Sequence, residues 1–208
     1  MEGIIHIAGT MPRIGTTTVA MQLILFLQRL GYKAAYVEMN SQDYIWGVTA
    51  LYADCIKDKL PGKVTYNGVE LYSKERLPEL ISGGTHYDYI ICDYGNIPAK
   101  SFDAQAFSDC SAMIIVAGVK PNEVFQTNQA LKEPILSDAV YVFSFINKAD
   151  EGDVLEMMQE KAAVTAFMPY APDPFTEIKI SLDDDAFYPT DECFHPVMCS
   201  VSELINGR

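Results

Sequence analysis

The sequence predicts an α/β fold in which a mostly parallel, doubly wound sheet has helices on both faces. Short apolar runs rich in β-branched residues alternate along the chain with longer segments of helical length. Strands that are apolar on both faces are typical of a parallel sheet covered on both sides. A loop rich in glycine and threonine, residues 9–18, joins the first such run to the first helical segment. Polar residues follow several runs, and sheets of this class bind ligands at the carboxyl ends of their strands.

The beginning of the chain shows the alternation most clearly. Residues 4–8 read IIHIA and predict a buried strand. Residues 19–30 are apolar over helical length, and Gly31 suits the position that follows a helix C-terminus. Residues 34–37 predict a second buried strand, and residues 43–56 predict a helix.

A small β-hairpin is predicted near residues 63–72. Asn67 and Gly68 lie between two short β-prone runs, and this pair tolerates the positive φ that both central positions of a type I′ turn require. A short helix is predicted at residues 76–81. Residues 87–93 then predict a strand that ends in a carboxylate.

The second half of the chain continues the same alternation of apolar runs and helical segments. Strands are predicted at residues 112–117, 140–146 and 165–168, and helices at residues 124–131 and 153–161.

Composition favours a folded protein with one domain that spans residues 1–208. Hydrophobic residues make up 49% of the chain and charged residues 21%, which is ordinary globular usage. The formal net charge of −13 disfavours binding to nucleic-acid backbones, because the protein repels phosphate. The five cysteines are odd in number, scattered and without a Cys-x-x-Cys pair, which argues against a disulfide framework and a structural zinc site.

The loop after the first strand has the order of a phosphate site, because the N–H groups of a loop and of a helix N-terminus then point at one place. The consensus P-loop adds a lysine for the phosphates and a Ser or Thr for magnesium. Aligned on Gly15, the lysine position is Thr16 and the magnesium hydroxyl is Thr17, while Gly9 lies one residue early. Arg13 is the cation within the loop. The alternative is an ordinary strand-to-helix turn with threonine N-caps.

Five segments together resemble the ParA/MinD group of deviant Walker P-loop ATPases, and the resemblance covers nearly the whole chain. The run YDYIICD resembles the family's Walker B strand and is the most specific of them. The segments are residues 4–18, 33–42, 87–93, 145–150 and 168–173.

The resemblance implies a P-loop NTPase-like fold with ATP and Mg²⁺ as cofactors. It implies that Thr17 and Asp93 hold the metal, and that Glu38 and Asp93 are catalytic if the protein is active. The residues that it places around the nucleotide are Gly9, Arg13, Gly15, Thr16, Thr17, Thr18, Asn147, Lys148 and Pro169.

Two departures from the family pattern affect the expected activity. The family's signature lysine is Met11 here, and the ordinary Walker lysine is Thr16. Without these cations, most of the charge stabilisation in phosphoryl transfer is lost. The chain therefore resembles the CpaE/TadZ branch. This resemblance implies a pseudo-ATPase that acts as a dimerising scaffold or positioning switch, with weak or no ATP hydrolysis.

Two other functions stay open. One is an active partitioning-type ATPase in which Arg13 or a partner supplies the cation. The other is a nucleotide-free protein-interaction module on the same fold. Single residues also have structural alternatives: Asp93 as a cap at a strand end, Glu38 as a solvated loop acid, and Asn147 as an Asx turn.

A protein partner and a homodimer are the expected interactions. The segment from residue 196 to residue 208 holds one cation, which does not support a membrane-targeting amphipathic helix. No signal peptide is expected, because the apolar run at residues 4–8 is short and the glycine-threonine loop follows it. These observations favour a cytoplasmic protein that binds neither nucleic acid nor membrane.

Overall fold

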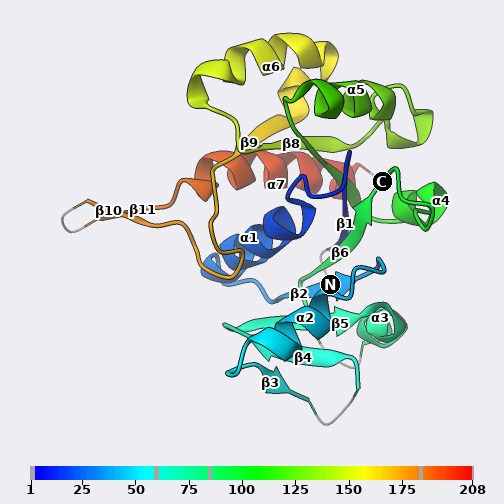
Figure 1. Cartoon of the computed structure of the whole chain (residues 1–208), viewed down its shortest axis with the longest axis vertical. Coiled ribbons are helices and arrows are strands. Elements are labelled where there is room, and N and C mark those ends of the chain that lie inside the picture. The colour runs from blue at the N-terminus through cyan, green and yellow to red at the C-terminus, as the bar shows by residue number, and fades with distance from the viewer. Residues whose placement is uncertain (1–2, 59–60, 84–85, 183–184, 208) are drawn as a thin grey trace.

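The computed structural model describes residues 3–58, 61–83, 86–182 and 185–207, and a nine-stranded sheet forms its centre (Figure 1). The strands of this sheet are β1 (Gly3–Gly9), β2 (Ala34–Glu38), β3 (Ile56–Lys57), β4 (Lys63–Tyr66), β5 (Val69–Ser73), β6 (Tyr89–Asn96), β7 (Ala112–Ala117), β8 (Val140–Ser144) and β9 (Thr165–Met168). Their order is β3-β4-β5-β2-β6-β1-β7-β8-β9. Neighbours from β5 to β9 in this order are parallel, and the β3–β4 and β4–β5 pairs are antiparallel.

Helices cover both faces of the sheet, as the sequence predicted. They are α1 (Thr16–Arg29), α2 (Tyr44–Leu51), α3 (Leu77–Ile81), α4 (Ala104–Ser108), α5 (Pro121–Ala130), α6 (Glu151–Met158) and α7 (Thr190–Asn206). Short 3₁₀ helices accompany them: η1 (Lys74–Arg76), η2 (Pro134–Leu136), η3 (Lys148–Asp150) and η4 (Gln159–Val164). A separate antiparallel pair, β10 (Ile180–Leu182) and β11 (Asp185–Phe187), extends from the body (Figure 1).

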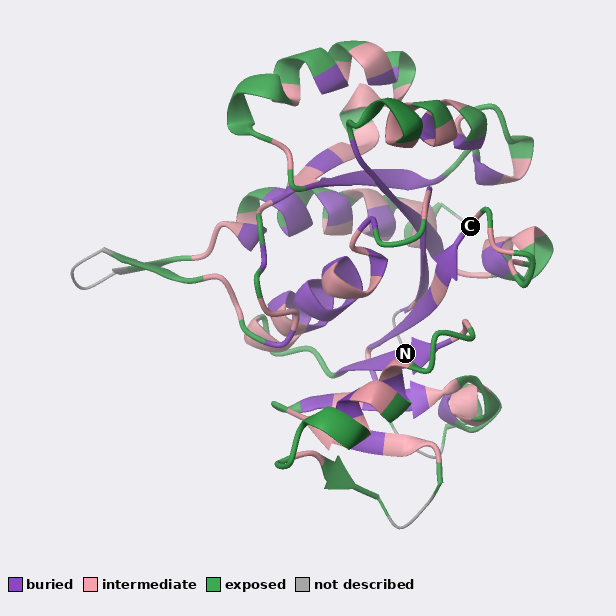
Figure 2. Cartoon of the chain, in the orientation of Figure 1, coloured by how far each residue is buried: buried purple, intermediate pink, exposed green. Residues whose placement is uncertain are grey.

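The hydrophobic core lies in layers on the two sides of the sheet. On one face, α1, α2 and α7 pack against the strands in a single cluster. On the other face, α4, α5 and α6 cover β7 and β8, and α3 covers β2 and β6. Figure 2 shows the central strands almost wholly buried, which explains why their sequences are apolar runs without alternation.

The predicted hairpin is present and belongs to the main sheet. Asn67 and Gly68 have φ values of 46° and 77°, as a type I′ turn requires. The second strand of the hairpin, β5, also pairs in parallel with β2. The hairpin therefore extends the parallel sheet with antiparallel strands.

Two predicted boundaries were wrong for reasons that the backbone shows. The helix predicted at residues 43–56 ends at Leu51, because Tyr52 turns to an extended conformation and Ile56 pairs with β4. The strand predicted at residues 140–146 ends at Ser144, because Phe145 has a φ of 62°. Other ends differ by a few residues: α1 begins at Thr16, β6 spans Tyr89–Asn96, α5 begins at Pro121, and α6 spans Glu151–Met158.

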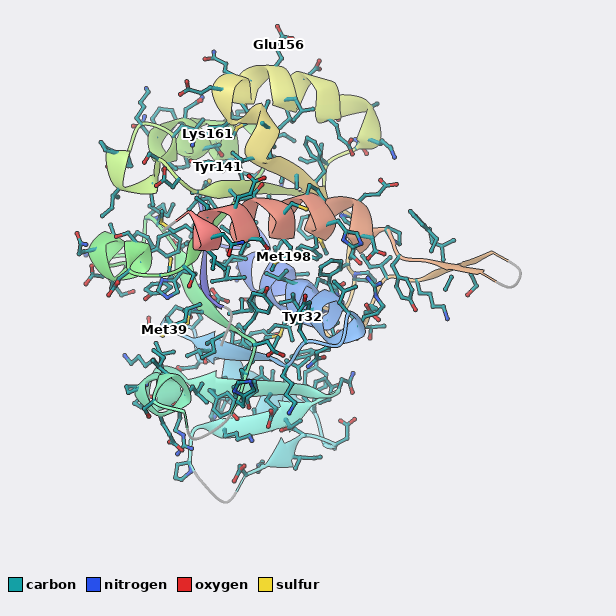
Figure 3. The ribbon with its side chains drawn as sticks, turned by 180° about the vertical axis from the view of Figure 1, so that it is seen from behind. Tyr32, Met39, Tyr141, Glu156, Lys161 and Met198 are labelled. Carbon is teal, nitrogen blue, oxygen red and sulfur yellow. The ribbon has the colours of Figure 1, made fainter. Side chains whose placement is uncertain are left out.

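The sequence analysis did not predict α4, α7, β3 or the β10–β11 pair. Helix α7 is the largest of these omissions. It contains Pro196 in its interior, and it buries Cys193, Phe194, Val197 and Val201. Seen from behind in Figure 3, α7 lies beside α1, and Met198 and Tyr32 line a groove between them. Within the described ranges, every helix is too short or too polar to cross a lipid bilayer.

Candidate functional site

The loop between β1 and α1 is held closely at its base. The N–H of Thr10 donates to the carbonyl of Val116 at 2.8 Å, and the N–H of Ile97 donates to the carbonyl of Gly9 at 2.9 Å. A Cβ atom at Gly9 would lie 2.4 Å from Oγ1 of Thr16, so only glycine fits there. The loop therefore returns tightly over the strand end and directs the start of α1 toward the carboxyl edge of the sheet.

The N-terminus of α1 lacks a side-chain cap. Its N-cap residue is Gly15, with a φ of 99°, and among the described residues no side-chain hydrogen bond caps this helix end. The three residues of that turn, Thr16, Thr17 and Thr18, lie inside the helix, so the alternative of threonine N-caps was wrong. N–H groups in the first turn of a helix have no partner within the helix, and the helix dipole favours an anion beside them. The geometry suits an anionic ligand.

Thr17 and Asp93 come together at the carboxyl ends of β1 and β6. The hydroxyl of Thr17 donates to Oδ2 of Asp93 at 2.7 Å, and the hydroxyl of Tyr36 donates to the same oxygen at 2.9 Å. The N–H of Gly95 donates to Oδ1 at 2.8 Å. The carboxylate is therefore fixed in direction, and the bond from Gly95 caps the turn that follows, as the structural alternative for Asp93 expected.

Burial raises the pKa of Asp93 above its usual range, and the hydrogen bonds from Thr17, Gly95 and Tyr36 oppose part of that rise. Among the described residues, no cation forms an ion pair with this carboxylate. An oxygen ligand pair made of a hydroxyl and a carboxylate is the kind that Mg²⁺ prefers, so the residues present fit this ion.

Glu38, which the resemblance made a catalytic candidate, has a structural role in this fold. Its two carboxylate oxygens accept from the N–H groups of Tyr44 and Ile45, at 2.6 and 3.1 Å, and so cap α2. The side chain is buried, and burial raises its pKa. The alternative of a solvated loop acid was therefore wrong. To act on a ligand, the carboxylate of Glu38 would have to give up hydrogen bonds from the first N–H groups of α2.

A cleft of about 350 Å³ lies above the loop. Its lining comes from the loop, the first turn of α1 and three other strand ends: Met11, Pro12, Arg13, Gly15, Thr16, Thr17, Thr18, Gln42, Tyr44, Gly95, Asn96 and Phe145. Arg13 is exposed, has a φ of 62°, and is the charged member of this lining. The cleft has the position that the sequence predicted for a ligand, and its lining mixes polar and apolar side chains with little charge.

Neither lysine position of the P-loop pattern is replaced by another cation. The side chain of Thr16 is buried against Gly9. Met11 lies at the start of the loop, and its sulfur accepts from the side-chain amide of Asn122 at 3.5 Å. The site thus offers N–H groups and hydroxyls to a phosphate, with Arg13 as the available guanidinium.

The structure does not bring Asn147 and Lys148 into this cleft. Asn147 is exposed, and its amide reaches the carboxylate of Asp150 at 3.4 Å. Lys148 forms a surface ion pair with Glu192 at 3.4 Å. Both residues lie outside the cleft because β8 ends at Ser144 and the backbone turns away before it reaches Asn147.

Phe145 takes the place in the cleft that the sequence analysis gave to Asn147. A Cβ at Gly15 would lie 3.1 Å from its ring. Pro169, at the end of β9, is half-buried and does not line the cleft, whereas the ring of its neighbour Tyr170 contacts Phe145. The sequence analysis missed Phe145 because it placed this residue inside the strand predicted at residues 140–146, whereas the positive φ of Phe145 ends the strand before it.

Three solved structures share this fold over most of their length. MinD cell division protein from Aquifex aeolicus matches with a TM-score of 0.63 and 15% identity, over 98% of this chain and 95% of that one. The MinC:MinD cell division protein complex from Aquifex aeolicus matches with a TM-score of 0.62 and 17% identity, over 81% and 82%. A plasmid partition protein from Borrelia burgdorferi B31, bound to AMPPNP, matches with a TM-score of 0.60 and 16% identity, over 95% and 96%.

The chain therefore has the ParA/MinD-like, P-loop NTPase-like α/β fold that its motifs predicted. No protein-family profile and no curated protein sequence matches it. At these identities the likeness concerns the fold, so the function rests on the site itself.

Proposed function

We propose that this protein binds ATP with Mg²⁺ in the cleft above the β1–α1 loop and acts as a dimerising scaffold or positioning switch with weak or no hydrolysis. The observation that carries the proposal is the hydrogen bond between Thr17 and Asp93 beneath the uncapped start of α1. This bond joins a hydroxyl from the first turn of α1 to a carboxylate from β6, and these are two oxygen ligands of the kind that a phosphate-bound Mg²⁺ would need.

The phosphates would be held mainly by backbone groups. The first-turn N–H groups of Thr16, Thr17 and Thr18 lack a side-chain acceptor from the cap residue, and the positive end of the helix dipole adds to their attraction. Arg13 lies on the rim of the same cleft and can pair with a terminal phosphate. Thr17 and Asp93 would hold Mg²⁺, which supplies positive charge next to the phosphates when bound.

Weak hydrolysis follows from the charges that are missing. A lysine at position 16 would face the developing charge in the transition state, and here a buried threonine stands there. Both oxygens of Glu38 are occupied by the start of α2, so the group is not free to orient water. Binding and turnover are therefore separated in this site, which favours a switch over an efficient enzyme.

The proposed role in positioning is supported by the fold and by charge. One of the structural neighbours is a MinD protein in complex with MinC, and another is a partition protein bound to AMPPNP. The net charge of −13 makes a protein partner more suitable than nucleic acid for this chain. We place this activity in the cytoplasm, with a homodimer as the functional unit.

Two other functions have specific observations in their favour. Arg13 lines the cleft, which would allow an active ATPase if this residue or a partner supplied the missing cation. Pro12 has no N–H to offer a phosphate, which would favour a nucleotide-free interaction module. Both can be separated from the proposed function by measuring binding and turnover independently.

The test is calorimetric titration with ATP, with and without Mg²⁺, on the wild type, Thr17→Val and Asp93→Asn. The proposal expects magnesium-dependent binding that both variants weaken, and steady-state phosphate release well below about 1 s⁻¹. Turnover at or above that rate would favour the ATPase. The absence of ATP binding to the wild type would favour the interaction module.

A further inference from the structure

Two exposed aromatic side chains meet at the rim of the cleft. Phe145 follows β8 and Tyr170 follows β9, and these two strands are parallel neighbours. Their ring centroids lie 5.6 Å apart with the planes at 60°. Phe145 is 47% exposed and Tyr170 is 69% exposed. Aromatic rings this exposed are not explained by core packing, although each touches the other.

The conformation of Phe145 is unfavourable by itself. A φ of 62° is rare for a bulky residue, and strained backbone of this kind clusters at ligand sites. The strained turn directs the ring over Gly15 and into the cleft lining that also includes Thr16, Thr17 and Thr18. The fold therefore holds an apolar ring partly in water, next to the proposed phosphate site.

A nucleobase is the ligand group that suits such a ring. Every base has a π-face, and stacking on an exposed aromatic residue depends little on which base is present. The two polar side chains that the sequence analysis assigned to the base side lie elsewhere, because Asn147 contacts Asp150 and Lys148 contacts Glu192. The two amides that line the cleft, Gln42 and Asn96, come from the ends of β2 and β6, and strands β1 and β7 separate these from β8. The chain thus offers a face for stacking at the end of β8, and these two amides belong to the opposite side of the cleft.

We infer that the base of the bound nucleotide stacks on the Phe145–Tyr170 pair, and that the site selects a nucleoside triphosphate by its base face without reading the base edge. The inference rests on the proposed function and makes it more specific. A site of this kind accepts different bases, so ATP and GTP bind with similar affinity and inorganic triphosphate binds less tightly. Tyr170 buttresses the ring of Phe145 and forms the outer part of the platform.

The experiment is a calorimetric titration of the wild type with Mg²⁺ and ATP, GTP or inorganic triphosphate. The wild type should bind ATP and GTP within about fivefold of each other. Phe145→Leu keeps an apolar contact with Gly15 and removes the π-face, so it should weaken ATP binding about 5- to 150-fold, the range that corresponds to one stacked base. It should leave the affinity for inorganic triphosphate unchanged.

Further variants serve as controls. Phe145→Trp restores an aromatic face and should bind ATP at least as well as the wild type, which guards against a folding defect in the leucine variant. Tyr170→Leu should weaken ATP binding less than Phe145→Leu. Phe125→Leu alters an exposed ring on α5 that does not line the cleft, and it should change nothing.

Each contrary outcome overturns a distinct statement. If Phe145→Leu weakens ATP and inorganic triphosphate equally, the ring supports the loop and the inference is wrong. If ATP binds more than about 100-fold better than GTP, the base edge is read and the inference is wrong. If Phe145→Leu leaves ATP binding intact but abolishes self-association, the pair is a protein contact. If no triphosphate binds to the wild type, the proposed function itself fails and the inference fails with it.

Discussion

The hydroxyl of Tyr36 donates a hydrogen bond to Asp93 at 2.9 Å, between the neighbouring strands β2 and β6. Both side chains are fully buried. Burial raises the pKa of Tyr36, so the phenol stays protonated and acts as the donor. The same carboxylate oxygen also accepts from Thr17, so one phenol inside the sheet helps to hold the group that we assign to magnesium.

Tyr36→Phe should destabilise the protein by about 1.5–3 kcal/mol, because it removes a hydrogen bond to a buried charged acceptor without changing the volume much. The measurement is urea unfolding at neutral pH. Tyr32→Phe, at a partly exposed ring in the segment after α1, is the matched control and should have little effect. A loss below about 0.5 kcal/mol in Tyr36→Phe would mean that the carboxylate does not depend on this donor.

The stability of the protein should depend on pH through Asp93. Burial raises its folded-state pKa above the unfolded value of about 3.9, so the folded state binds more protons in that window. The resulting stabilisation is fully present below about pH 4 and is lost as the pH rises through the folded-state pKa. Asp93→Asn cannot ionise, so its free energy of unfolding relative to the wild type should increase from pH 4 to pH 7.

That comparison is best made in chelator, so that divalent cations do not bind the carboxylate. The difference between Asp93→Asn and the wild type cancels the pH dependence of the other acidic groups, including Glu38, whose pKa burial also raises. A difference that stays constant over this pH range would show that Asp93 ionises normally in the folded protein.

Gly9→Ala should destabilise the protein by about 1–3 kcal/mol, the usual cost of overpacking. The new Cβ would lie 2.4 Å from Oγ1 of Thr16 and 2.5 Å from Cγ2 of Ile14. Gly47→Ala is the matched control, because Gly47 lies inside α2 with open space around it, and there alanine should stabilise by about 0.5–1 kcal/mol. Opposite shifts in thermal unfolding are expected, and a neutral Gly9→Ala would mean that the loop has room to move.

The sequence was sufficient for the parallel sheet because its strands are buried on both faces. The run at residues 112–117 is entirely apolar and became β7, and Asn67 and Gly68 specified a turn that only a few residue pairs can form. Helix α7 was missed because Pro196 interrupts its pattern, and its helical state depends on packing against α1 and β9. Tertiary contacts of that kind leave little local signal.

The metal side of the candidate site was predictable, because its polar residues stand at recognisable positions after or within a predicted strand. Thr17 and Asp93 follow directly from their positions after β1 and in β6, and their side chains meet. The part of the cleft assigned to the nucleobase was not predictable. A positive φ at Phe145 ends β8 early and displaces Asn147 from the cleft. Neither the residue types around Phe145 nor their spacing in the sequence predicts that turn. The role of Glu38 as the cap of α2 was also hidden, since it depends on where the helix begins.

Thr16→Lys should increase the affinity for ATP in the presence of Mg²⁺ by about 10- to 150-fold, since a charged hydrogen bond contributes about 1.5–3 kcal/mol. Thr16 already lines the cleft, and the uncapped first turn of α1 is directed there, so an ammonium would join N–H groups that are in place. The side chain of Thr16 is now buried against Gly9, and the longer lysine must leave that contact for the cleft.

Thr16→Met, which has similar length without charge, separates the effect of charge from that of size. Asp93→Ala in the lysine background should remove much of the magnesium-dependent part. If the lysine variant binds ATP no better than the methionine variant in calorimetric titration, the loop does not cradle phosphate, and the nucleotide-free interaction module becomes the better account of the protein.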